Sequence, residues 1–558
     1  MLNIHKQYLQ ETIGADGNVS DYTFKVPEKF NFAYDVIDLI AAAEPQRRAM
    51  YWCNEIGEEH TFSFADMSKA SDQAASFFLQ QGIRRGDKVV LILKRHYQFW
   101  FAILGLHKIG AVGIPATNQL HEKDLLYRFE AAEVRAVLCT SEGEVGSEVE
   151  KAAAAYNKPL VLMMAKGARE GWLDFDAGML SAPPFQRPTG EAEPVISDTM
   201  LLYFTSGTTG MPKMVTHDFS YPLGHIPTAK YWHKVDPDGL HLTVSETGWA
   251  KSVWGKLYGQ WFMEAGIDVF DFDRFDPHVM LNHISSAGVT TFCSPPTIYR
   301  FLIREDLKQY DLSKLQHCTI AGEALNPEVY EQFLRATGLE LKEGYGQTEM
   351  TLAVVTNYWM KTKPGSMGKP SPVYNIALLD DQNQEVPVGQ SGEICVRTGD
   401  TKLPGMFSGY YKDDKLTASV WHDGYYHTGD LAWMDEDGYL WFVGRTDDII
   451  KSSGYRIGPF EVESVLMEHP AVLECAITGV PDPVRGQVIK ATVVLSRGYT
   501  ASDDLRAELQ DYVKTHTAPY KYPRILEFVS ELPKTISGKI RRVQIRADSN
   551  EDTSEIVD

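Results

Sequence analysis

The sequence predicts an α/β protein with a large N-terminal domain and a smaller α+β C-terminal domain. Strand-like apolar runs at residues 88–93, 111–115 and 136–139 alternate with helical segments, which is typical of βαβ units and largely parallel sheets. Near residue 445 the pattern changes to that of a compact small domain. Because 558 residues exceed what one hydrophobic core usually accommodates, two or more domains are expected.

The elements can be placed in order along the chain. Apolar residues recur at helical spacing from Asp66 to Gln81, and Gly82 then ends the helix. A turn-rich stretch before residue 445 predicts a small β subdomain with short strands at 392–396, 425–426 and 439–442. Beyond it we expect helices at 459–469 and 502–516 and strands at 474–480 and 488–495. We place the boundary at Asp447, between a domain of residues 1–446 and one of residues 447–558.

The composition is that of an ordinary globular protein and excludes several classes of function. Hydrophobic residues make up 44% and charged residues 23% of the chain. The net charge of −21 opposes general binding to nucleic acid or to anionic membranes. Neither an apolar run of about 18 residues nor a signal-peptide pattern is visible, so we expect a cytoplasmic protein. The six scattered cysteines, without a Cys-x-x-Cys pair, favour reduced thiols over disulfides or a zinc site.

Residues 205–213 form a candidate phosphate-binding loop. They read Thr-Ser-Gly-Thr-Thr-Gly-Met-Pro-Lys and follow the apolar run 200–204. Glycines let the backbone approach an anion, and backbone N–H groups and hydroxyls donate to phosphate oxygens. The spacing differs from the Gly-x4-Gly-Lys-[Ser/Thr] loop of common NTPases, because Met-Pro separates Gly210 from Lys213. A flexible surface loop would have the same composition.

Two further segments carry groups that suit a nucleotide. Residues 345–349, Tyr-Gly-Gln-Thr-Glu, offer an aromatic ring for adenine, a hydroxyl for phosphate and a carboxylate for Mg²⁺. Asp430 follows a tight Thr-Gly turn, where it could bind the ribose hydroxyls, and Arg445 could be a second ribose or phosphate ligand. The alternatives are a plain turn before a helix, a common Asp turn and a surface ion pair.

The C-terminal part ends in a basic segment. Residues 533–539, Pro-Lys-Thr-Ile-Ser-Gly-Lys, place Lys539 on a glycine-containing loop, and residues 515–546 hold seven Lys or Arg against two Asp or Glu. This is either a solvated basic face or an anion site that the small domain brings over the nucleotide.

Together these segments resemble the AMP-forming acyl-CoA synthetases, within the wider adenylate-forming enzymes. The resemblance covers residues 35–546 and rests on four motifs in the family's order: 205–213, 345–349, 428–430 with 444–456, and 533–539. Residues 246–255 and 343–349 look most like the medium-chain branch. The resemblance implies stacked, mostly parallel sheets and a mobile C-terminal domain that turns about a hinge at Asp447.

The resemblance also implies the reaction and its site. A carboxylate and ATP give an acyl-AMP and pyrophosphate, and coenzyme A then takes the acyl group and releases AMP. Lys539 would be the main catalytic residue with Thr348 at the α-phosphate, and Glu349 would hold Mg²⁺. The implied ATP-binding set is Thr205, Ser206, Gly207, Thr208, Thr209, Gly210, Lys213, Gly322, Glu323, Ala324, Gly344, Tyr345, Gly346, Gln347, Thr348, Asp430, Arg445 and Lys539.

Coenzyme A and the acid have implied sites of their own. The coenzyme A set is Gln119, Ser453, Gly454, Tyr455, Arg456, Arg485 and Lys521. Pocket walls are Trp249, Val253, Gly322 and Gly346, with Trp254 either a wall or core packing. Acetate-specific relatives carry a tryptophan where this chain has Gly346, so acids of roughly four to ten carbons or benzoate-like acids are expected.

Other readings of the chain stay open at this point. The first alternative is a stand-alone adenylation enzyme that loads a carrier protein, the second is a silent nucleotide-binding scaffold, and the third is a luciferase-like oxygenase. The expected partners are small molecules, without nucleic acid or membrane, and the sequence leaves a homo-oligomer open.

Overall fold

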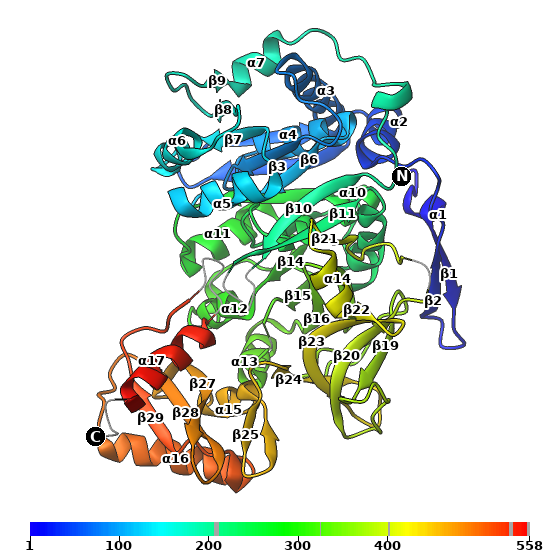
Figure 1. Ribbon diagram of the computed structural model, residues 1–558. Coiled ribbons are helices and arrows are strands. Elements are labelled where there is room, and N and C mark those ends of the chain that lie inside the picture. The colour runs from blue at the N-terminus through cyan, green and yellow to red at the C-terminus, as the bar shows by residue number, and fades with distance from the viewer. Residues whose placement is uncertain (206–210, 324, 400–401, 535–539, 555–558) are drawn as a thin grey trace.

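A computed structural model describes residues 1–205, 211–323, 325–399, 402–534 and 540–554. The described chain forms two large mixed sheets, a small β subdomain and a C-terminal α+β unit at one end of the molecule (Figure 1). This confirms the predicted α/β class. Among the described helices, none has both the length and the apolar character needed to cross a bilayer.

The first large sheet carries the predicted parallel strands. From β10 to β9 all neighbours are parallel, and β11 and β21 extend the sheet in antiparallel fashion. Its described order is β21 (Gly409–Tyr410), β11 (Lys213–Asp218), β10 (Thr199–Thr205), β6 (Val112–Pro115), β5 (Lys88–Ile92), β7 (Ala136–Thr140), β8 (Val161–Ala165) and β9 (Leu173–Asp174).

The second large sheet has a parallel centre and antiparallel edges. Six strands from β16 to β3 run parallel, while β17, β18 and β4 are antiparallel to their neighbours. Its described order is β18 (Lys369–Pro370), β17 (Met350–Val355), β16 (Leu341–Gln347), β15 (His317–Ala321), β14 (Thr291–Ser294), β12 (Leu240–Thr243), β13 (Gly266–Asp271), β3 (Arg48–Asn54) and β4 (Glu59–Ser63).

Helices connect the strands and complete the core. α3 (Phe64–Gln80) starts at a capping box of Ser63 and Asp66, and α4 (Gln98–Ile109) is buried along its whole length. One core cluster takes side chains from both sheets and from α4, so these layers share a core. The further helices include α5 (Glu122–Ala132), α6 (Val145–Ala155), α7 (Phe175–Ser181), α9 (Lys251–Lys256), α10 (Tyr258–Phe262), α11 (Pro277–Ala287), α12 (Pro296–Leu302) and α13 (Pro327–Thr337).

The small β subdomain is larger than the sequence suggests. Its antiparallel strands are β19 (Asn375–Leu379), β20 (Ser391–Arg397), β22 (Trp421–His422), β23 (Tyr425–Met434) and β24 (Leu440–Arg445). The strand expected at 425–426 continues to Met434, because the Thr-Gly-Asp segment forms an irregularity within β23 instead of ending it.

The C-terminal unit has a hydrophobic core of its own. Its elements are β25 (Ile450–Ser452), β26 (Tyr455–Ile457), α15 (Pro459–Leu466), β27 (Val472–Asp482), β28 (Gly486–Leu495), α16 (Asp503–His516), β29 (Ile525–Phe528) and α17 (Arg542–Ser554). Asp447 lies between β24 and β25, and its role as domain boundary and hinge stays a prediction.

Candidate active site

The predicted nucleotide residues lie where strands of different sheets end. β16 ends at Gln347 and its antiparallel neighbour β17 begins at Met350, so Thr348 and Glu349 form the tight turn between them. The alternative of a plain turn before a helix is therefore wrong, because these residues form a hairpin turn. Thr205 and Lys213 are register partners at the ends of β10 and β11, on either side of the candidate phosphate loop.

Asp430 is the centre of a hydrogen-bond network that joins two sheets. Its Oδ2 accepts from Tyr345 Oη at 2.6 Å and from Gln347 Nε2 at 2.7 Å, and its Oδ1 lies 3.2 Å from Arg445 Nη1. The Oη of Tyr426 donates to Gln347 Oε1 at 2.7 Å. Asp430 and Arg445 are register partners on β23 and β24, which explains why residues 15 apart meet. The structure thus brings four predicted ATP-binding residues together.

Glu349 lies beside the end of the candidate phosphate loop. Tyr410 Oη donates to Glu349 Oε1 at 2.9 Å, and Lys213 Nζ lies 5.4 Å from the centre of the Tyr410 ring. Burial raises the pKa of Glu349, and the hydrogen bond from Tyr410 opposes that rise. The Glu349 carboxylate is an oxygen ligand of the kind that Mg²⁺ prefers, and the nearby ammonium group of Lys213 suits phosphate oxygens.

A hydrogen bond from His217 holds the backbone of Thr348 in the turn. His217 Nε2 donates to the Thr348 carbonyl at 2.7 Å, and its ring stacks on Tyr221 with centres 3.8 Å apart. His217 is fully buried, and burial lowers its pKa to about 3, so the imidazole is neutral at physiological pH. Because a carbonyl only accepts, the proton of this neutral ring is on Nε2.

The expected open space beside Gly346 is filled. A Cβ at Gly346 would lie 2.7 Å from Cη2 of Trp254, and Trp254 Nε1 donates to Tyr221 Oη at 3.3 Å. Trp254 is 7% exposed and Val253 is fully buried, so both pack into the core cluster. The inference that Gly346 leaves room is therefore corrected, since the indole of Trp254 occupies that space.

The remaining predicted ATP and pocket residues lie on neighbouring loops. Gly322 has a φ of +108°, and a Cβ there would lie 3.8 Å from Lys251 Nζ. Glu323 Oε2 accepts from Thr297 Oγ1 at 3.1 Å. Gly344 packs on Trp232 and Leu352 and leaves no space for a side chain. Trp249 is partly buried in the loop before α9.

Most predicted coenzyme A residues gather on one face of the C-terminal unit. Ser453 and Gly454 form the β25–β26 turn, and Arg485 Nη1 lies 3.2 Å from Ser453 Oγ. Tyr455 stacks on Tyr520 with ring centres 3.9 Å apart, and the adjacent Lys521 binds Glu461. Two predicted residues lie apart from this group. Arg456 binds Asp381 of the β subdomain at 2.6 Å, and Gln119 is on the loop between β6 and α5.

The basic segment at residues 515–546 is partly neutralised. Arg542 forms a two-point ion pair with Glu463, and Arg546 binds Asp448 at 2.5 Å. These two cations therefore support the C-terminal fold and do not form an open anion site. Seven predicted residues lie outside the described part of the chain: Ser206, Gly207, Thr208, Thr209, Gly210, Ala324 and Lys539.

Three residues that sequence reasoning missed complete the site. Tyr410 contacts Glu349, His217 holds Thr348, and Tyr426 orients Gln347. None belongs to a recognisable motif, although His217 follows the phosphate loop on the same strand as Lys213. Their contacts depend on the pairing of β11 with β21 and on the position of the β subdomain, which local sequence does not indicate.

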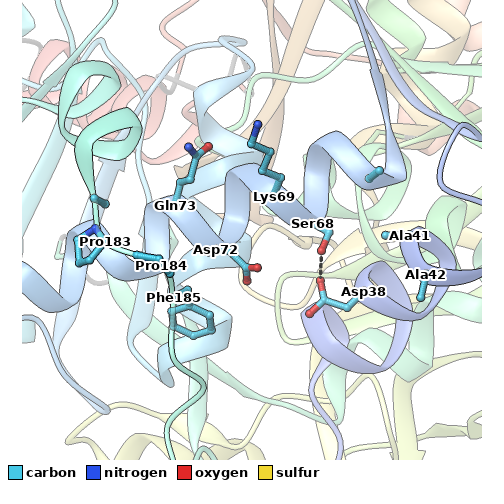
Figure 2. Close-up of a pocket in the computed structure, with 12 residues that line it drawn as sticks. Asp38, Ala41, Ala42, Ser68, Lys69, Asp72, Gln73, Pro183, Pro184 and Phe185 are labelled. Carbon is cyan, nitrogen blue, oxygen red and sulfur yellow. Dashed lines mark hydrogen bonds between the residues drawn. The ribbon is translucent and has the colours of Figure 1, made fainter.

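A surface hollow of about 670 Å³ lies elsewhere (Figure 2). Asp38, Ser68 and Asp72 line it together with residues 182–185, and both aspartates bind the buried Lys108. It contains none of the predicted site residues, so it is separate from the candidate active site.

Comparison with known proteins agrees with this geometry. Residues 38–411 match the AMP-binding enzyme family, and residues 461–539 match the C-terminal domain of AMP-binding enzymes. "Acyl-coenzyme A synthetase ACSM3, mitochondrial" of Rattus norvegicus is 40% identical over 535 residues, which cover 94% of this chain and 92% of that protein. "Acyl-coenzyme A synthetase ACSM5, mitochondrial" of Homo sapiens is 41% identical over 531 residues, with 94% and 91% covered.

A solved structure shows the same likeness. The anthranilate CoA ligase AuaEII in complex with anthranoyl-AMP superposes with a TM-score of 0.86 at 26% identity, over 95% of this chain and 99% of that one. Family membership implies ATP and coenzyme A as co-substrates. The curated relatives are named as mitochondrial, so the cytoplasmic location expected here stays a prediction. The chain belongs to the AMP-binding enzyme family and is an AMP-forming acyl-CoA synthetase, which confirms the resemblance in its sequence.

Proposed function

We propose that this synthetase activates straight or branched acids of roughly four to ten carbons, or benzoate-like acids. The indole of Trp254, which is 7% exposed beside Gly346, offers an apolar surface and supports an acid with a hydrophobic body. A methylene in such a pocket contributes about 1–3 kcal/mol, so several neighbouring chain lengths are accepted. The ligand of the neighbour AuaEII, an anthranoyl-AMP, agrees with a pocket that admits a ring.

The network around Asp430 supports the residue roles in this proposal and is the observation that carries them. Asp430 and Arg445 bind the ribose, Tyr345 faces the adenine, and Thr348 contacts the α-phosphate. Glu349 holds Mg²⁺, whose charge neutralises the phosphate oxygens that the acid approaches. Lys213 and the loop 206–210 hold the β- and γ-phosphates.

Lys539 brings a cation from the C-terminal unit to the carboxylate and the α-phosphate. A lysine suits this task because its ammonium group is a compact point charge. We expect Lys539→Ala to lose pyrophosphate exchange while the protein keeps its fold and its affinity for coenzyme A. Exchange at the parental rate in Lys539→Ala would falsify the assignment.

Thioester formation requires the C-terminal unit to turn about Asp447, so that the face with Ser453, Gly454 and Tyr455 meets the reaction centre. Arg456, Arg485 and Lys521 then bind the coenzyme A nucleotide, with Gln119 on the large domain. Arg456→Ala should slow thioester formation and leave pyrophosphate exchange intact. Asp381→Ala is the matched control, because it breaks the same ion pair and keeps the arginine.

The acid range and the second substrate can be measured in one assay. AMP release is followed over carboxylates from acetate to decanoate and benzoate, with and without coenzyme A. We expect a maximum between the short and long ends of the series and strong stimulation by coenzyme A. Release that coenzyme A leaves unchanged, with acyl transfer to a carrier protein, would instead support the stand-alone adenylation enzyme.

A further inference from the structure

Three potential metal ligands meet on the β subdomain, away from the nucleotide site. Glu393 and Cys395 are on β20, and His427 is the register partner of Cys395 on β23. Tyr426 and Thr428, on either side of His427 along β23, are buried, and the Tyr426 side chain reaches Gln347. His427 therefore lies on the other face of the strand.

The three side chains are spaced as ligands of one ion. His427 Nδ1 lies 3.4 Å from Cys395 Sγ and 3.1 Å from Glu393 Oε2, and the three ligand atoms lie within 4.8 Å of one another. In tetrahedral zinc sites, Zn–S of about 2.3 Å and Zn–N of about 2.0 Å separate sulfur from nitrogen by roughly 3.5 Å. The separation of 3.4 Å between His427 Nδ1 and Cys395 Sγ is close to that value.

Hydrogen bonding alone satisfies this cluster poorly. One ring nitrogen cannot donate to the Glu393 carboxylate and accept from the Cys395 thiol at the same time. His422 stacks on the His427 imidazole with ring centres 4.2 Å apart. A cation at the centre would use a lone pair from all three ligand atoms.

We propose that Glu393, Cys395 and His427 bind one Zn²⁺ ion, with water in the fourth position. Thiolate, imidazole and carboxylate are a donor set that zinc accepts, and the ligands come from two paired strands that hold them in place. Cys395 is fully buried, while the side chains of His427 and Glu393 are 10% and 23% exposed, which gives the ion a route from solvent. Binding replaces the thiol proton, which is released to solvent.

The ion would stabilise a segment that the nucleotide site depends on. Glu393 Oε1 accepts from Gly429 N at 2.7 Å, and its Oε2 faces the proposed ion. Gly429 has a φ of +71° and lies within the irregularity of β23, directly before Asp430. Zinc on one oxygen of Glu393 therefore fixes the carboxylate whose other oxygen holds this segment.

Cobalt titration of the full-length, tag-free protein tests the proposal. After chelator treatment under reducing conditions, the parent should bind one equivalent of Co²⁺ and show a thiolate-to-cobalt charge-transfer band that Zn²⁺ removes. Cys395→Ala should lose the band. Cys318→Ala is the matched control, because Cys318 is a buried free cysteine on β15 outside the cluster.

A second variant keeps the test decisive if Cys395→Ala does not fold. Glu393→Gln retains an acceptor for Gly429 N and should weaken Co²⁺ binding about tenfold or more. Zn²⁺ should also raise the melting temperature of the parent and of Cys318→Ala, because it binds only the folded state. A parent without the band, a band that persists in Cys395→Ala, or unchanged affinity in Glu393→Gln would each show a hydrogen-bonded triad instead of a metal site.

Discussion

The hydrogen bond from Tyr410 to Glu349 makes a specific prediction about the pH dependence of adenylation. Tyr410→Phe removes one hydroxyl and keeps the ring that faces Lys213. Burial and the Glu349 charge both raise the pKa of Tyr410, so the hydroxyl stays a donor over the working pH range. The variant therefore changes one interaction of the proposed magnesium ligand.

The size and sign of the effect follow from the structure. A hydrogen bond to a charged group contributes about 1.5–3 kcal/mol, and about 1.4 kcal/mol corresponds to one pKa unit. The pKa of Glu349 is already raised by burial, and loss of the Tyr410 donor should raise it further. Since only the ionised carboxylate holds a cation, adenylation activity falls as the pH drops through the pKa of Glu349. In Tyr410→Phe the acid limb of the pH–activity profile should therefore move to higher pH.

Pyrophosphate exchange measures this directly. The dependence of kcat/KM for MgATP on pH reports the free enzyme, so the acid limb of Tyr410→Phe should shift upward. Tyr411→Phe is the control, because its neighbouring ring faces Lys88 and Lys412 instead of Glu349. An acid limb that coincides for the parent, the variant and the control would refute the reasoning.

Other changes test the rest of the site. Asp430→Asn keeps the shape but removes the charge that faces Arg445, so KM for ATP should rise by about 10–100-fold; an unchanged KM in steady-state kinetics would count against the ribose role. Trp254→Ala removes the indole beside Gly346 and should move the kcat/KM maximum to longer acids, whereas an unaltered acid profile would contradict a pocket there. Burial raises the pKa of Glu343 to about 8, so the folded state keeps a proton that the unfolded chain loses above its ordinary value near 4.5, and stability falls as pH rises through this window. Glu343→Gln should remove this slope of about 1.4 kcal/mol per pH unit, which urea unfolding between about pH 5 and pH 8 measures.

Local pattern was sufficient for much of the fold. The apolar runs at 88–93 and 136–139 are strands because each is short, buried and bounded by turns, and the strand before the phosphate loop ends at Thr205 where the small residues begin. The helix from Asp66 was expected two residues late, since its capping residue Ser63 precedes the apolar pattern. These strands and the start of this helix can be predicted because they are determined by residues that are close together in the sequence.

The parts that sequence missed depend on contacts between distant segments. Tyr410 reaches Glu349 because β21 pairs with β11, and no residue near Tyr410 indicates that pairing. Gly346 indicated open space because a sequence shows that a glycine has no side chain, but it does not show which distant residue packs against it. In a close-packed interior such space is taken by another side chain, here Trp254 from α9.

The contacts between the C-terminal unit and the rest of the chain support a movable arrangement. In the described part of the chain, no hydrophobic core cluster joins the two. The Arg456–Asp381 pair is exposed at both ends, and exposed ion pairs contribute about 0–1 kcal/mol. Asn326 Nδ2 donates to the Ser464 carbonyl at 3.3 Å, a contact that water can replace when the surfaces separate. Phe442 of β24 also contacts Phe460 of α15, with ring centres 6.1 Å apart. The exposed ion pair and the single hydrogen bond hold one orientation without preventing another, as the proposed turn about Asp447 requires.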